Sequence, residues 1–127
     1  MGNTQLKLEN AAKGLLMMSE SDYPFTYFTT EASAIDDQLL LSLAEQPAGA
    51  PIEKTDIDKL LRNMTSTASG SVNQRTAEQF TNLSNQLKEE LTELAVYRIG
   101  EISIEVLIIG FTKEGTIAGM RTKLIET

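Results

Sequence analysis

The chain has 127 residues, of which 41% are hydrophobic and 23% charged, and this composition predicts one folded domain over residues 1–127 with a single core. It contains no cysteine and no histidine, which excludes disulfides, thiolate nucleophiles, zinc sites of the Cys/His kind and imidazole as a general base. The net charge of −7 argues against direct binding of nucleic acid, because phosphate recognition needs an excess of Lys and Arg.

The same acidic charge favours rapid encounter with a basic partner, although solubility alone is a sufficient reason for it. No apolar run approaches the length of about 18 residues that a membrane span needs. The first residues are polar where a signal peptide would be apolar. We therefore expect a cytoplasmic protein with no membrane partner and no cofactor.

The first half of the chain predicts a helix over 5–18, because apolar residues recur there at helical spacing. Pro24 cannot continue a helix, and the aromatic and β-branched run 25–30 is typical of a strand. Residues 39–43 are a second candidate strand, and Pro and Gly in 45–51 predict a loop. The apolar face of the first helix consists of Leu8, Ala11, Ala12, Leu15 and Leu16.

The second half begins with a short helix over 55–64, in which Thr55 and Asp58 have capping-box spacing. Residues 65–74, "TSTASGSVNQ", are small and polar and predict a mobile loop. A long amphipathic helix is expected over 75–94, with Glu89 and Glu90 on its polar side; its apolar positions are Ala77, Phe80, Leu83, Leu87, Leu91 and Leu94.

Two strands are expected to close the chain. The run 97–112 alternates Ile102, Ile104, Val106 and Ile108 on one side, while Leu107 and Ile109 make the other side apolar too, so this strand is expected to be covered on both faces. A turn around Gly115 leads into the last strand. These elements predict an α+β fold, a three-layer α-β-α sandwich around a mainly antiparallel sheet.

The last strand runs to Thr127 without a polar tail, which is unusual for a chain end unless that end is used. Near the other end of the chain, Glu20 and Asp22 share the turn "SESD" and could bind a hard cation, but a solvated turn is the stronger reading of this segment alone. Arg98 and Arg121 are expected to pair with Glu101, Glu105 or Glu126 rather than to clamp a phosphate. Residue chemistry alone therefore favours an interaction module over an enzyme.

Three blocks resemble the nuclease A inhibitor family. They are "GLLMMSESDYPF" at 14–25, "DIDKLL" at 56–61 and "VYRIGEISIEVLIIGFTKEGTIAGMRTKLIET" at 96–127. Together they cover roughly two fifths of the chain, in the order and at spacings compatible with the family. The string "SES" followed by an acidic residue and "YPF" and the string G-x-x-AG-x-x-TK-x-x-ET are the most specific parts.

The resemblance implies a PR-1-like α-β-α sandwich and a protein inhibitor that is not itself an enzyme. It also implies a partner, a DNA/RNA-nonspecific, magnesium-dependent endonuclease of the ββα-metal class, whose active site the inhibitor blocks. Carried onto this sequence, the residues directed at the catalytic metal of the nuclease are Glu20 and Thr127. Asp22, Gln74 and Glu126 are possible further interface residues, and the inhibitor has no metal of its own.

The implied chemistry agrees with the charge. A nuclease that grips phosphates presents a basic groove with a hard cation in it, and carboxylate and hydroxyl oxygens are ligands that such a cation accepts. We expect a monomer that forms a heterodimer with the nuclease.

The chain departs from the family in residues 65–74. The family presents a Trp and several acidic residues in the loop before the long helix, whereas this chain has no Trp. Two alternatives therefore stay open. The first is an acidic interaction domain on the same scaffold that binds a different basic protein, and the second, a minority hypothesis, is a carboxylate-based, metal-assisted enzyme.

Overall fold

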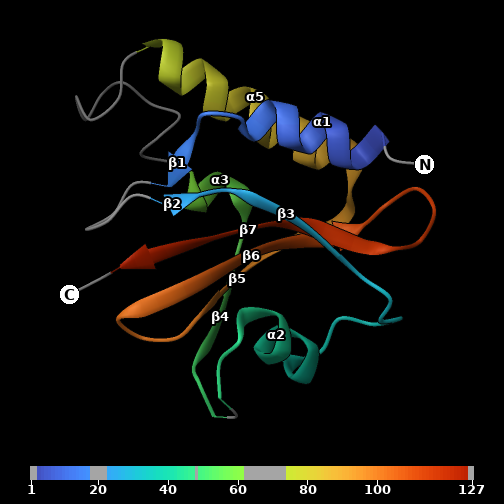
Figure 1. Ribbon diagram of the computed structural model, residues 1–127, viewed down its shortest axis with the longest axis vertical. Coiled ribbons are helices and arrows are strands. Elements are labelled where there is room, and N and C mark those ends of the chain that lie inside the picture. The colour runs from blue at the N-terminus through green and yellow to red at the C-terminus, as the bar shows by residue number, and fades with distance from the viewer. Residues whose placement is uncertain (1–2, 18–22, 48, 62–73, 126–127) are drawn as a thin grey trace.

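A computed structural model describes residues 3–17, 23–47, 49–61 and 74–125 of the chain. A five-stranded antiparallel sheet in the order β3-β7-β6-β5-β4 forms the middle layer, with α1, α3 and α5 over one face and α2 over the other (Figure 1). The predicted α+β fold, a three-layer α-β-α sandwich, is therefore confirmed. No helix within the described part is long and apolar enough to cross a membrane.

The helices and strands are short except in the second half of the chain. The helices are α1 (Asn3–Ala12), α2 (Asp37–Ala44), α3 (Ile57–Leu60) and α5 (Gln74–Glu90). The strands of the main sheet are β3 (Thr26–Thr30), β4 (Ile52–Thr55), β5 (Thr92–Ile99), β6 (Ser103–Phe111) and β7 (Ile117–Ile125). A separate two-stranded ribbon is formed by β1 (Leu16–Met17) and β2 (Tyr23–Pro24).

Strand β6 is buried on both faces, as its sequence predicts. Val106 and Ile108 face the core cluster that contains α1 and α5, whereas Leu107 and Ile109 face the cluster that contains α2. All four side chains are 0% exposed. Because successive side chains of a strand alternate between faces, a strand that is apolar at every position needs cover on both sides.

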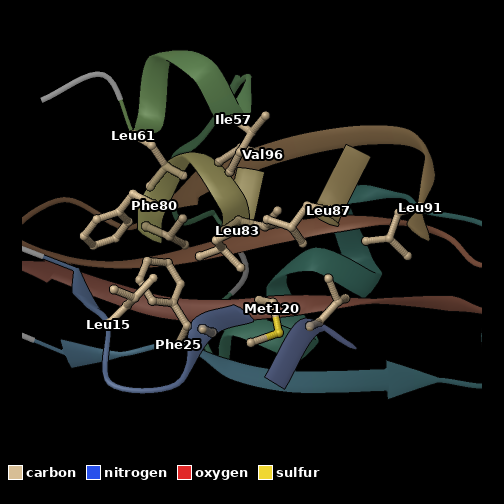
Figure 2. Packing of buried hydrophobic residues seen from close by; sticks show 14 of the residues in the cluster. Leu15, Phe25, Ile57, Leu61, Phe80, Leu83, Leu87, Leu91, Val96 and Met120 are labelled. Carbon is tan, nitrogen blue, oxygen red and sulfur yellow. The ribbon is translucent and has the colours of Figure 1, made fainter. Parts of the chain in front are cut away.

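The larger cluster lies between the sheet and α1, α3 and α5. Figure 2 shows side chains of α5 packed together with Phe25, which lies between β2 and β3, and with Met120 of β7. Its buried members are Leu8, Ala12, Leu15, Phe25, Ile57, Leu61, Phe80, Leu83, Leu87, Leu91, Val96, Ile104, Val106, Ile108, Ala118, Met120 and Leu124. The smaller cluster, around α2, consists of Leu40, Ala44, Ile99, Leu107, Ile109 and Ile117.

Two predictions in the first half of the chain are wrong. The first helix ends at Ala12 rather than residue 18, because Gly14 has a left-handed φ of 79° that turns the chain out of the helix, and the residues that follow Leu15 form β1. Residues 39–43 belong to helix α2 rather than to a strand. The carboxylate of Asp36 caps this helix by accepting from the backbone N–H of Leu39 at 2.8 Å.

The short helix α3 is present, but its cap differs from the predicted one. Asp56, rather than Thr55, is the N-cap, and its Oδ1 accepts from the N–H of Lys59 at 2.8 Å. Thr55 instead ends β4. This edge strand was not predicted, because its four residues are too few to show the alternation of apolar and polar side chains typical of a strand. Residues 62–73, which contain most of the predicted mobile loop, lie outside the described residues.

The long helix is confirmed but ends at Glu90. Leu94 therefore lies in β5, where it is half-buried against the same core. Glu93, the second residue of β5, has a positive φ of 53° and lies at a register shift in the pairing of β5 with β6. This bulge lets the chain reverse at once from helix into sheet, with no Gly or Pro to signal it.

The run 97–112 is two strands, β5 and β6, rather than one. A single strand of that length would extend about 53 Å, whereas a turn at Gly100 lets Tyr97–Ile99 at the end of β5 pair with Glu105–Leu107 of β6. Ile102, predicted on an apolar face, is consequently 62% exposed in the turn. The turn at Gly115 is confirmed, with its N–H donating to the carbonyl of Thr112 at 2.9 Å.

A buried carboxylate joins α1 to α5. Glu90, predicted on the polar side of the long helix, is only 3% exposed. Its two oxygens accept from the hydroxyl of Thr4 at 3.1 Å and from the ammonium of Lys7 at 3.2 Å. Burial opposes ionisation of Glu90, but hydrogen bonds from Lys7 and Thr4 and the charges of Lys7 and Lys113 hold its pKa below the ordinary value.

We expect Glu90→Gln to lower the free energy of unfolding at pH 7 by about 2 kcal/mol, since it removes charge-assisted hydrogen bonds from a buried position. A carboxylate with a lowered folded pKa stabilises the protein above its ordinary pKa of 4.5, and this contribution disappears as the pH falls through the folded pKa. The difference between the two proteins in urea unfolding should therefore shrink below pH 4.5. Glu89→Gln, an equal change of charge at an exposed neighbour, is the control and should change little.

Gly119 lies where a side chain has no room. A Cβ built on it would overlap the carbonyl oxygen of Ile108 in the neighbouring strand. We expect Gly119→Ala to lower the free energy of unfolding by more than about 2 kcal/mol, because the centre of the sheet must move to accommodate it. Gly14→Ala meets open space and only backbone strain, so it should cost about 1 kcal/mol. Equal losses in thermal unfolding of the two variants would contradict this.

Candidate partner-binding site

Of the five predicted interface residues, the described part of the chain contains Gln74 alone. Glu20 and Asp22 fall within 18–22, and Glu126 and Thr127 are the last two residues, so all four lie outside the described residues. The position of the site therefore has to be argued from the residues that flank these segments.

The segment with Glu20 leaves and re-enters the described structure at adjacent points. Met17 and Tyr23 are paired across the β1–β2 ribbon, followed by Leu16 with Pro24. The ribbon is held over the sheet by Leu15 before it and Phe25 after it, both buried in the larger core. The ring of Phe25 meets the edge of Phe80 from α5, with centroids 6.2 Å apart (Figure 2).

The carboxyl end of β7 lies against this ribbon. The hydroxyl of Thr122 donates to the carbonyl oxygen of Tyr23 at 3.3 Å. The ammonium of Lys123 lies 5.5 Å from the centroid of the Tyr23 ring, within the range of a cation–π contact. Figure 1 shows β1, β2 and the carboxyl end of β7 at the same side of the molecule. The fold thus brings together the flanks of the two predicted contact segments, which are about 100 residues apart in sequence.

Gln74 begins α5 and is exposed. Its side-chain amide donates to Glu78 one turn later at 3.3 Å. Phe80, which contacts Phe25 beneath the ribbon, lies about 9 Å further along the helix axis. In Figure 1 the amino end of α5 lies over the side of the molecule that carries β1 and β2. The position of Gln74 is therefore compatible with a shared interface.

A polar depression of about 300 Å³ lies beside this end, between the last turn of α1 and the first turns of α5. Its lining combines two cations, one carboxylate and three amides, contributed by Asn10, Ala11, Lys13, Arg75, Glu78, Gln79 and Asn82. Nothing in its chemistry resembles a catalytic set. Within the described residues, no three of Asp, Glu, Cys or His come together in a way that could hold a metal ion.

Among the described residues, Arg98 and Arg121 form ion pairs with carboxylates other than Glu101 and Glu105, and the expected partner Glu126 lies outside the described residues. Arg98 lies 3.5 Å from Glu53 on the neighbouring β4, and Arg121 lies 4.0 Å from Glu45 and donates to the carbonyl of Leu43 at 3.1 Å. Glu105, expected to pair with an arginine, lies 3.4 Å from Lys123 instead. These partners come from distant parts of the chain, and a single sequence carries no signal for such pairings.

Burial and nearby carboxylates also affect one tyrosine of the sheet. Burial, together with the carboxylates of Glu9 and Glu114, raises the pKa of Tyr27 on β3 above its ordinary value. A tyrosine at the ordinary pKa of 10.0 is already neutral at physiological pH, so the raised pKa of Tyr27 leaves its charge there unchanged.

Sequence reasoning did not assign a role to Lys123 or Tyr23. Both residues nevertheless lie inside the two strings that carry the family resemblance, Tyr23 in "YPF" and Lys123 in "TK-x-x-ET". Their contact across the fold is the observation that links those strings.

Comparison with known proteins agrees with the resemblance. The family model described as nuclease A inhibitor-like protein matches residues 2–127, essentially the whole chain. No curated protein matches it. The family name implies a nuclease as partner and inhibition as the function. This chain belongs to the nuclease A inhibitor-like family.

Proposed function

We propose that this chain inhibits a sugar-nonspecific, magnesium-dependent endonuclease of the ββα-metal class by blocking its active site. In this proposal the carboxylate of Glu20 and the hydroxyl or carboxylate of Thr127 are directed at the catalytic metal of the nuclease. The inhibitor acts as a binding partner rather than as an enzyme, and it forms a one-to-one complex. Its oxygens take the place of substrate phosphate.

The observation that carries the proposal is the contact between β2 and β7. Glu20 precedes Tyr23 by three residues and Thr127 follows Ile125 by two, and an extended chain spans at most about 3.6 Å per residue. Tyr23 touches Thr122 and Lys123, so the points at which the chain continues toward Glu20 and toward Thr127 lie on one side of the molecule, which supports a shared site. Glu20 and Thr127 could reach the same metal ion only if their segments lie close together.

Charge supports the same partner. The chain carries a net charge of −7, and a nuclease groove that binds nucleic acid is basic. Opposite charges speed the encounter and orient it, and they make association sensitive to salt. Asp22 and Glu126, which neighbour the two proposed ligands in sequence, would add to this field, and Gln74 would contribute a polar contact at the rim.

A second candidate is an acidic interaction domain on the same scaffold that binds a different basic protein. The absence of Trp favours it, because aromatic anchors concentrate binding energy in interfaces and the family places a Trp in the loop before the long helix. This candidate predicts binding that does not depend on Glu20 or Thr127, so the two experiments below separate the candidates.

Removal of Thr127, or extension of the chain beyond it by a short tag, should weaken inhibition at least about 30-fold, the effect typical of a residue at the centre of an interface. The expected reason is loss of a ligand to the metal, or steric exclusion of that ligand. The measurement is an inhibition titration against a ββα-metal nuclease, with thermal unfolding as a check that the fold is intact. The same tag placed before residue 1 is the control. Undiminished inhibition by the extended protein would overturn the proposed mechanism.

Glu20→Gln should also weaken inhibition at least about 30-fold, because the amide keeps the shape of the side chain but loses the charge that a divalent cation attracts. Glu114→Gln is the matched control. Glu114 is exposed in the turn between β6 and β7, at the opposite end of β7, and its substitution changes the net charge equally. If both variants lose the same modest amount, the effect is one of overall charge and the assignment of Glu20 fails.

A further inference from the structure

Lys123 lies in a row of three side chains that crosses three strands. On one side its register partner on β6 is Glu105, whose carboxylate is 3.4 Å from the ammonium. On the other side lies the ring of Tyr23, 5.5 Å from the ammonium to the centroid. The row therefore ties β2 to the sheet through β7.

The β1–β2 ribbon has little backbone pairing of its own and depends on side-chain contacts for its position. It has two residues in each strand, and an isolated hairpin of any length is marginally stable in water. The main ladder does not reach it, because the pairing of β3 with β7 begins at Thr26 with Arg121. Pro24 has no N–H to offer a neighbouring strand. Contacts with the Tyr23 ring and carbonyl therefore hold β2 against β7, a role that backbone hydrogen bonds between strands have elsewhere in the sheet.

We propose that Lys123 and Tyr23 are positioning residues that hold the β1–β2 ribbon against the end of β7 and so set the spacing between the Glu20 and Thr127 segments. This rests on the proposed function for its effect on the nuclease. The contact itself concerns described residues alone and can be tested without a partner.

The contact between Lys123 and the Tyr23 ring affects the position of the ribbon relative to β7 more than the stability of the hydrophobic core. The side chain of Lys123 is 36% exposed, and it is not a member of the hydrophobic cluster that contains Leu15, Phe25 and Phe80. A partly exposed cation–π contact affects an equilibrium only modestly. Two ligands that must reach one metal are more sensitive, since binding in the correct geometry depends on both being positioned in advance.

The test compares Lys123→Met with Lys54→Met. Lys54 lies 6.0 Å from the ring centroid of Tyr97, the same kind of contact on the edge strand β4 at the far side of the sheet. Both variants lose one positive charge, so the change in net charge is shared. Lys123→Met combined with Glu105→Gln restores the original net charge and removes the carboxylate that the single variant would leave without its lysine partner.

Two measurements are made on each full-length variant. The first is deuterium uptake over residues 14–25, followed by mass spectrometry without nuclease. The second is the inhibition constant against the nuclease. We expect Lys123→Met, with or without Glu105→Gln, to raise uptake in this segment and to weaken inhibition about five-fold or more. Lys54→Met should change both by less than about two-fold, and Lys123→Arg, which keeps the cation over the ring, should restore both.

The outcomes separate the two proposals. If deuterium uptake over 14–25 is the same in Lys123→Met and Lys54→Met, Lys123 does not hold the ribbon and the inference is overturned. If uptake rises but inhibition matches that of Lys54→Met, the contact has no positioning role and the inference is likewise overturned. Failure of the wild-type chain to inhibit any ββα-metal nuclease overturns the proposed function and with it the functional part of this inference, while the uptake comparison still decides the structural part.

Discussion

Burial of β6 on both faces is the constraint from which the rest of the structure follows. A strand with Val106 and Ile108 on one side and Leu107 and Ile109 on the other cannot face water on either side. It must lie inside a sheet, with strands along both edges and helices over both surfaces. The amphipathic α5 with α1 covers one surface and α2 the other, and the turn at Gly115 places β7 beside β6.

The position of β7 in turn determines where its carboxyl end lies. β7 has β6 on one edge and β3 on the other, and β2 precedes β3 directly in the chain. The end of β7 therefore lies beside β2 as a consequence of the sheet order. Tyr23 contacts Thr122 and Lys123 there. A partner that approaches this side of the molecule meets segments from both ends of the sequence, supported by one hydrophobic core.

The agreement between sequence and structure is greatest where a pattern is long and one-sided. The helix α5 and the doubly buried β6 were predicted because many residues repeat the same spacing. Shorter elements were misassigned. Residues 39–43 are four leucines and one serine, a run too short to show a helical or a strand period, and only the cap at Asp36 indicates a helix. The burial of Glu90 was missed because its partners, Thr4 and Lys7, approach it from a helix more than 80 positions earlier.

The sequence by itself determined the fold class, the family and the identities of the candidate contact residues, because hydrophobic period, composition and the strings around Glu20 and Thr127 are local properties of the chain. Only the tertiary structure decided that the flanks of those two segments meet, and that Lys123 and Tyr23 join them. The physical reason is that contacts across a sheet depend on strand order and register. These are set by the packing of the whole core rather than by any short stretch of residues.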